Sequence, residues 1–123
     1  MIDEMSRPRG SLRAQQIAKL GRLRMASERE GDVHTICLFG ELDLATAERV
    51  QHGFEHAEAS DAEAIVLDLS GLTFIDSTGV RLLLLAHARS RADSDRLVLL
   101  RGPAAVQRVF ELTGIVERLP FAD

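Results

Sequence analysis

Residues 65–79 read IVLDLSGLTFIDSTG, and they contain the change of pattern that decides the fold. The run from Ala64 to Leu69 is almost entirely apolar, which is typical of a central strand buried on both faces. A loop is expected after Leu69. Asp76-Ser77-Thr78-Gly79 then stands at the start of an apolar segment, residues 77–90, with the spacing of a helix. The stretch therefore predicts a buried strand that leads through a loop into a helix.

Asp76 and Ser77 suit this helix start in two ways. As an N-cap, either side chain would accept a hydrogen bond from an unpaired backbone N–H, an effect of about 1 kcal/mol. A helix start also offers free N–H groups and partial positive charge, so a phosphate on Ser77 would be tolerated there. That phosphate would add a charge of about −1.5 to −2 at one point of the surface. If this point lies in a protein interface, the added charge can expel the partner without unfolding the domain.

The segments on either side alternate between strand and helix patterns. Leu23–Glu28 and the loosely alternating run Val33–Phe39 are expected to pair as a hairpin around Gly31-Asp32. Further strands are expected at 64–69 and 96–101, with a last short one at Ile115–Leu119. Helices are expected at 46–59, 77–90 and 103–113, the first with an apolar stripe formed by Ala47, Val50, Phe54 and Ala57. This alternation predicts an α/β domain with a mixed, partly parallel sheet of about four to five strands, covered by about three to four helices.

Composition narrows the possible functions. The chain has 123 residues, enough for one domain, and only 4% of them are aromatic, with no Trp or Tyr, so a base-stacking surface is not expected. Residues 1–24 carry six basic and two acidic side chains (net +4), whereas the rest carries nine and seventeen (net −8), which argues against DNA binding by the body. The longest apolar run, Leu82–Ala86, is far too short to cross a membrane.

The start of the chain and its cysteine indicate the compartment. Met1–Gly10 lacks the apolar region of a signal peptide, and Cys37 is the only cysteine, so a cytoplasmic protein without an internal disulfide is expected. Cys37 lies in an apolar run and is expected to be a small buried hydrophobe. Residues 1–22 are predicted to form a flexible or weakly helical extension, in which Leu12, Ile17 and Leu20 could line one side of a helix. The folded domain is expected at 23–123.

Four blocks, taken in order, resemble the STAS domain, the fold shared by anti-sigma-factor antagonists and the cytosolic ends of sulfate transporters. They are Phe39-Gly-Glu-Leu-Asp43 before the first helix, the strand and helix start at 65–79, the strand Leu97-Val-Leu-Leu, and the final helix segment PAAVQRVFELTGI at 103–115. The combination is specific although each block alone is weak, and it covers the chain from about residue 23 to the end.

This resemblance implies a phosphorylation switch. Ser77 would be the family's phosphoacceptor, Asp43 the acidic residue near it, and Asp76, Thr78 and Gly79 would belong to the same partner-binding surface. The unphosphorylated protein would bind an anti-sigma factor that is also a serine protein kinase, so that the sigma factor is released. The kinase would phosphorylate the antagonist and a metal-dependent serine phosphatase would reverse the step. ATP and Mg²⁺ would belong to the kinase, and the chain itself would need no cofactor and catalyse no reaction. Thr78, where antagonists often carry Ser, is a second hydroxyl that could be modified.

Several alternatives remain at this point. A protein of this fold could instead be the regulatory subunit of a lipid-transport ATPase, or a piece of a stress-signalling scaffold. His52 and His56 have the i, i+4 spacing of zinc ligands, but no third ligand is evident and both fall on the charged side of their helix, so solvent exposure is expected. His34 and His87 are expected to be structural, and Asp43 could simply cap the helix that follows it. Helix 77–90 is apolar all round, which fits either extra core packing or an exposed partner surface. A serine hydrolase is not supported, because Ile75 replaces the first glycine of the Gly-x-Ser-x-Gly pattern.

Overall fold

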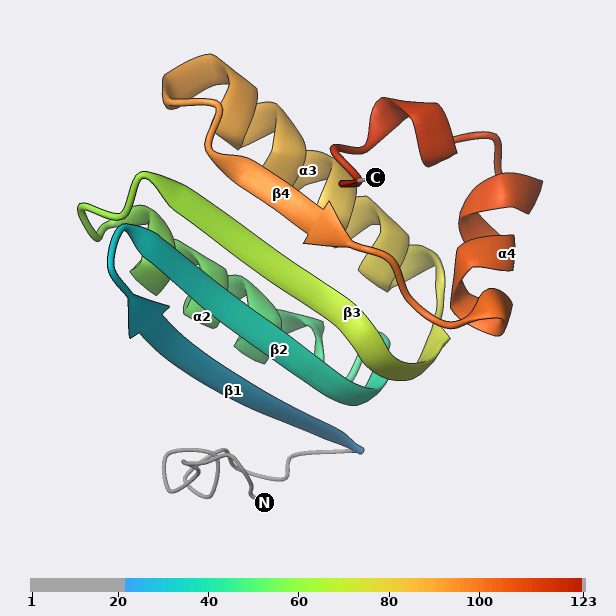
Figure 1. Cartoon of the computed structure of the whole chain (residues 1–123). Coiled ribbons are helices and arrows are strands. Elements are labelled where there is room, and N and C mark those ends of the chain that lie inside the picture. Colours follow the sequence, from blue (N-terminus) through green and yellow to red (C-terminus); the bar gives the residue numbers. More distant parts are fainter. Residues whose placement is uncertain (1–21, 123) are drawn as a thin grey trace.

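The computed structural model describes residues 22–122 as four strands and three α-helices, with one short 3₁₀-helix near the end (Figure 1). In chain order the elements are β1 (Leu23–Glu30), β2 (Val33–Leu42), α2 (Ala47–Glu58), β3 (Ala64–Ile75), α3 (Ser77–Asp93), β4 (Leu97–Leu100), α4 (Ala104–Leu112) and η1 (Val116–Arg118). The predicted α/β class and the expected numbers of strands and helices are confirmed. Most of the predicted extension, residues 1–21, lies outside the described residues.

The sheet is mixed, with the strand order β1-β2-β3-β4. β1 and β2 form the predicted antiparallel hairpin around Gly31, whose positive φ of 60° suits a tight turn. β2 pairs with β3, and β3 with β4, in the parallel sense. Each parallel connection therefore contains a helix, α2 in the first and α3 in the second.

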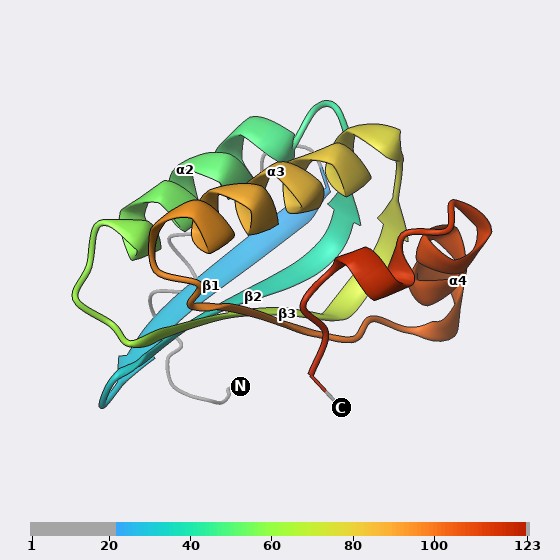
Figure 2. The same cartoon turned by 90° about the horizontal axis from the view of Figure 1, so that it is seen from above.

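Helices α2 and α3 lie side by side on one face of the sheet, whereas α4 lies beyond one end of β3 and β4 (Figure 2). The predicted stripe of α2 is buried against the sheet: Ala47, Val50, Phe54 and Ala57. From α3 the core receives Val80, Leu83 and Ala86, while Leu82 and Leu84 are partly buried against it. Most of the apolar surface of α3 is thus core packing, although Leu85 remains 49% exposed.

The predicted end of the third strand is wrong. β3 does not stop near Leu69 but continues through Ile75, because its pairing with β2 continues beyond two irregularities in the register. One lies between Cys37 and Phe39 and the other between Gly40 and Glu41. Ser70 and Gly71, the first residues of the expected loop, lie within β3. The expected loop is therefore reduced to one residue, Asp76, between β3 and α3.

Two smaller predictions are also wrong. Ile115–Leu119 forms no strand: Val116–Arg118 is a turn of 3₁₀-helix, and the chain meets the sheet only after it, where Phe121 forms an isolated bridge to Leu99. Cys37 is half-buried rather than buried, because it lies on the face of β2 opposite the helices. No helix among residues 22–122 is both long and apolar enough to cross a membrane.

Candidate functional site

The predicted site residues meet where β2 and β3 end together. Leu42 and Ile75 are the last paired residues of these parallel strands. The backbone N–H of Asp76 extends the ladder by donating to the carbonyl oxygen of Leu42, at 3.2 Å. Asp43 and Asp76 therefore leave the sheet from adjacent strands at the same edge. The structure brings together two segments that are more than thirty residues apart in the sequence.

Asp76 is the N-cap of α3. Its backbone is extended, and its Oδ1 accepts a hydrogen bond from the backbone N–H of Gly79 at 3.0 Å. The sequence allowed either Asp76 or Ser77 as the N-cap, and in the structure the N-cap is Asp76. Ser77, the first helical residue, is exposed, and no hydrogen bond to its hydroxyl occurs among residues 22–122. The Ser77 hydroxyl is thus accessible at the positive end of a 17-residue helix.

Thr78 and Gly79 lie progressively deeper. Thr78 is half-buried and Gly79 is buried. A Cβ atom at Gly79 would come within 2.9 Å of the Leu42 carbonyl oxygen and within 2.7 Å of the Ile75 side chain. Glycine is needed here because the first turn of α3 lies directly against the end of β2. Gly79 thus sets the position of Ser77 relative to Asp43, and its own surface faces inward.

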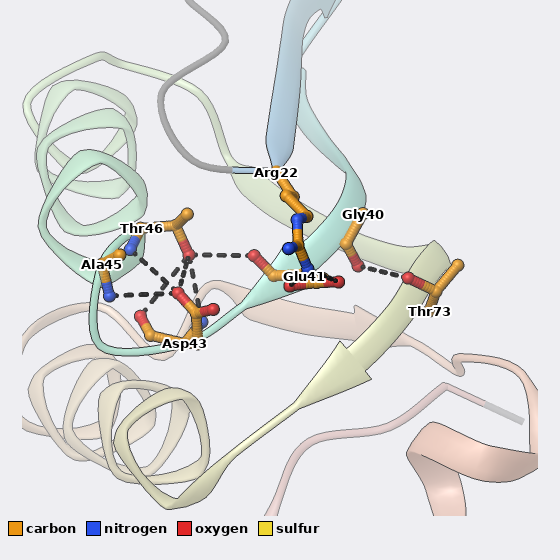
Figure 3. A network of polar contacts seen from close by, with 7 residues as sticks. All are labelled: Arg22, Gly40, Glu41, Asp43, Ala45, Thr46 and Thr73. Carbon is orange, nitrogen blue, oxygen red and sulfur yellow. Dashed lines mark hydrogen bonds and ion pairs between the residues drawn. The ribbon is translucent and has the colours of Figure 1, made fainter.

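Asp43 organises the turn between β2 and α2 (Figure 3). Its Oδ1 accepts hydrogen bonds from the backbone N–H groups of Ala45 (3.0 Å) and Thr46 (3.2 Å). The buried Thr46 hydroxyl donates to the Glu41 carbonyl oxygen at 2.9 Å and accepts from the Asp43 N–H at 3.0 Å. Asp43 thus caps the turn that leads into α2, whereas the helix itself begins at Ala47 and has Thr46 as its N-cap.

The end of the sheet is tied to its neighbours by two further contacts (Figure 3). Arg22 Nη1 lies 3.0 Å from Glu41 Oε2, and the Thr73 hydroxyl donates to the Gly40 carbonyl oxygen at 3.2 Å. The ion pair is largely exposed, so its contribution to stability is small. Within residues 22–122, neither Asp43 nor Asp76 forms an ion pair.

Two large apolar side chains at this edge were missed in the sequence. Leu44 is 78% exposed in the turn directly after Asp43, and Phe74 is 47% exposed near the end of β3. Leu44 gave one usable signal, because an apolar residue in a polar turn has no core to join. The structure therefore places exposed apolar groups in the two segments that carry Asp43 and Ser77. Such a mixture of apolar and acidic groups suits a protein interface better than a small-molecule pocket.

The histidines lie elsewhere and have separate environments. His52 and His56 are exposed on α2, as expected. His34 is buried, and a 2.6 Å hydrogen bond joins its Nε2 to the Ser27 hydroxyl. Burial, helped by the nearby charges of His56 and Arg29, lowers the pKa of His34 below its ordinary value of 6.5. In the part of the chain that the structure describes, no three potential ligands are grouped to hold a metal ion.

Comparison with known proteins gives consistent matches. Residues 25–120 match a family model described as "Mlab, STAS domain". Over 88 residues the chain is 31% identical to the anti-sigma-B factor antagonist of Listeria monocytogenes, a match that covers 72% of this chain and 77% of that protein.

Solved structures show the same fold. The crystal structure of an anti-sigma factor antagonist from Mycobacterium paratuberculosis superposes with a TM-score of 0.72 at 23% identity, covering 80% of this chain and 84% of that one. The Bacillus cell fate determinant SpoIIAA has been solved in two forms. The unphosphorylated form matches with a TM-score of 0.66 at 28% identity (80% and 88% covered), and the phosphorylated form with 0.60 at 27% identity (80% and 91% covered).

Proposed function

Because the chain belongs to the STAS domain family, we propose that it is an anti-sigma factor antagonist controlled by phosphorylation of Ser77. The unphosphorylated form binds an anti-sigma factor that is also a serine protein kinase, and this binding releases the sigma factor. Phosphorylation ends the contact and a serine phosphatase restores it. The cycle takes place in the cytoplasm, and the chain acts in it as a binding protein, not as an enzyme.

The observation that carries this proposal is the position of Ser77. Its hydroxyl is exposed at the first residue of α3, at the same sheet edge as Asp43 and beside the exposed Phe74. A kinase can reach this hydroxyl without any part of the fold opening. Leu44 follows Asp43 in the turn after β2, and Phe74 lies three residues before Ser77, so a partner bound at this end of the two strands is expected to lie close to Ser77.

The effect of the phosphate follows from charge and hydration. Modification adds about −1.5 to −2 charges to a surface that already holds Asp43 and Asp76. A bound partner would have to take this dianion out of water, at a large cost in free energy unless a cation faces it. The fold itself tolerates the group, because unpaired N–H groups of the first turn of α3 and the exposed Arg81, one helical turn further on, lie close to it.

The chemistry divides between this chain and its partners. The kinase supplies ATP, Mg²⁺ and the base that takes the hydroxyl proton; Ser77 Oγ accepts the γ-phosphoryl group and ADP leaves. The phosphatase directs water to the phosphoserine, so inorganic phosphate leaves and the hydroxyl returns. This chain contributes the hydroxyl, the surface around it and no cofactor. The two solved forms of SpoIIAA, phosphorylated and unphosphorylated, support a reversible cycle of this kind.

A second function fits the same family, namely the regulatory subunit of a lipid-transport ATPase. A role in a stress-signalling scaffold would likewise keep the fold and replace the partner. Purification of the tagged chain from its own cells distinguishes these possibilities. Recovery of a serine kinase with a sigma factor released into solution supports the proposal, whereas recovery of a transporter ATPase contradicts it.

A further inference from the structure

Strand β1 forms one edge of the sheet. β2 pairs with one side of it, and within residues 22–122 no strand pairs with its other side (Figure 1). An unpaired edge offers backbone N–H and C=O groups to another strand, and proteins usually prevent such pairing with a short strand, a proline, a bulge or charges. β1 is eight residues long, contains no proline and pairs with β2 without a shift in register. Its charged side chains therefore decide what this edge can bind.

The hydrogen-bond pattern fixes which backbone groups of β1 point outward. The Glu41 N–H donates to the Arg22 carbonyl oxygen at 2.9 Å, and the register from Leu23 to Glu30 then runs without a shift. In an antiparallel pair, residues that exchange hydrogen bonds alternate with residues that do not. The even-numbered residues of β1 therefore turn their N–H and C=O groups toward β2. The odd-numbered ones, from Leu23 to Arg29, turn theirs to the outer side of the edge.

These outward groups restrict how a second β1 strand can pair with the first. In an antiparallel pair, residues that exchange hydrogen bonds lie opposite each other. Because these are the odd-numbered residues in both copies, an odd residue faces an odd one and an even residue faces an even one. The two-fold axis that relates the copies then passes beside one residue of the strand and cannot pass between two residues.

Charge selects one of these axes. With the axis at Ala26, Arg24 of one copy faces Glu28 of the other. Arg22 then faces Glu30. Each opposite-charge pair occurs twice because of the two-fold axis, and no like charges face each other. An axis one residue earlier or later keeps only half of these pairs, and an axis two residues away places Arg24 or Glu28 opposite itself.

The side chains needed for these pairs are available. Arg24, Glu28 and Glu30 are exposed, and within the described residues none of them forms an ion pair. Arg24 points to the face of the sheet opposite α2 and α3, where its guanidinium lies 5.4 Å from the centre of the Phe39 ring. Glu28 lies on the same face, because side chains alternate along a strand. The Arg22 side chain is 76% exposed and can reach a second carboxylate.

We propose that β1 binds β1 of a second copy of this chain, antiparallel and centred on Ala26. A second copy is the occupant because the charges of β1, basic at its start and acidic at its end, are complementary to the same strand reversed. The pairing joins two four-stranded sheets into one continuous sheet. Ser77 follows β3, and β2 separates β3 from this edge, so the dimer does not depend on the proposed function.

Reversal of the charges tests the register. We expect sedimentation equilibrium of the full chain at low ionic strength to show a reversible dimer. Arg24→Glu and Glu28→Arg should each raise the dissociation constant about tenfold or more, because each replaces two attractive pairs by repulsive ones. The double variant Arg24→Glu/Glu28→Arg restores opposite charges and should dimerise as the native chain does. Arg108→Glu and Glu111→Arg, at exposed positions near α4 and on it, are matched controls that should change nothing.

The same experiment can overturn the proposal in three ways. The native chain could stay monomeric at millimolar concentration, or it could form a dimer that neither single reversal weakens. The double variant could also fail to restore the dimer although its circular dichroism spectrum is that of the native fold. Each of these results would show that β1 does not pair with itself about Ala26.

A disulfide tests the axis directly. Ala26 lies opposite Cys37 of the same chain in β2, so Cys37→Ser provides the background. In that background Ala26→Cys should form a disulfide-linked dimer under mild oxidation, because opposite residues of a non-hydrogen-bonded pair have Cα atoms about 4.5 Å apart. Glu30→Cys lies far from residue 30 of the other copy in this register and should stay monomeric. A linked dimer from Ala26→Cys alone supports the proposal, and any other result overturns it.

Discussion

The backbone N–H of Asp76 donates to the carbonyl oxygen of Leu42 over 3.2 Å, and this bond joins the start of α3 to the end of β2. It fixes the phosphoacceptor candidate Ser77 beside the turn that holds Asp43. The distance between the two segments is therefore set by the sheet and is independent of the conformation of a loop. A surface that must recognise one protein in one covalent state gains specificity from this rigidity.

Charge at Ser77 should decide partner binding. We expect Ser77→Asp to weaken binding of the anti-sigma kinase at least about tenfold, because it introduces part of the phosphate charge at an exposed helix start. Ala88→Glu adds the same charge at an exposed position of the same helix and serves as the control. Calorimetric titration against the purified kinase measures both. Equal affinities for the two variants would speak against an interface at Ser77.

Removal of the hydroxyl should trap the complex. Ser77→Ala is expected to bind the kinase as tightly as the native chain and to take up no phosphate in the presence of ATP and Mg²⁺. Native gel analysis of the complex, followed over time, should show a band that disappears for the native protein and persists for the variant. Incorporation of phosphate into Ser77→Ala would indicate that the phosphoacceptor is Thr78, which is half-buried in the first turn of α3.

The exposed apolar residues should supply much of the binding energy. We expect Leu44→Ala and Phe74→Ala each to reduce affinity for the partner by about 1 to 3 kcal/mol, the range for large side chains at the centre of an interface. Neither should lower stability appreciably, since both side chains are exposed. Leu112→Ala, at a residue that is 75% exposed on α4, is the matched control. Equal affinity of all three variants would place the interface elsewhere.

Gly79 and Gly53 should respond in opposite ways to alanine. A Cβ atom at Gly79 meets the Leu42 backbone and the Ile75 side chain, so we expect Gly79→Ala to cost about 1 to 3 kcal/mol of unfolding free energy. At Gly53 the nearest atoms belong to the flexible end of Met25, and alanine favours the helix by about 0.5 to 1 kcal/mol. Urea unfolding of both variants measures the difference. Equal stability of the two would contradict the close approach of α3 to β2.

Stability should fall in mild acid because of His34. Its pKa in the folded protein is lowered, mainly by burial and further by His56 and Arg29, so the unfolded chain binds the proton more readily. Neutral His34 therefore gives its full stabilisation above the pKa of the unfolded chain, about 6.5. This stabilisation is lost as the pH falls from there through the lower pKa of His34 in the folded protein. His34→Gln should flatten this part of the profile, whereas His52→Gln, at an exposed position, should not. A native profile that is flat between pH 7 and 5 would be inconsistent with the lowered pKa.

Much of the fold could be predicted because its helices and strands have regular patterns. The stripe of α2 and the hairpin at Gly31 are local signals, and the structure confirms both. The end of β3 could not be predicted, since the irregular register at Cys37 and Gly40 breaks the alternation that marks a strand. The burial of Cys37 was misjudged for a different reason: an apolar run does not reveal whether one face or both faces of a strand are covered.

In the candidate site, too, local features could be predicted from the sequence and tertiary ones could not. Ser77 was predicted from its place in a helix start and from family resemblance. The choice of Asp76 as N-cap, the close contact at Gly79 and the exposure of Leu44 and Phe74 all depend on how β2 and β3 meet. These features arise from tertiary pairing of segments far apart in the sequence, which local pattern cannot supply.

The central claim is that one phosphate on Ser77 separates two binding states of this protein. The most direct measurement combines intact-mass and fragment-ion analysis of the protein isolated from its own cells, free and in complex with its partner. We expect a singly phosphorylated fraction with the phosphate on Ser77 in the free pool, and only unphosphorylated protein in the complex. Absence of phosphate on Ser77 in both pools under every growth condition, or equal phosphorylation in the two, would contradict the account.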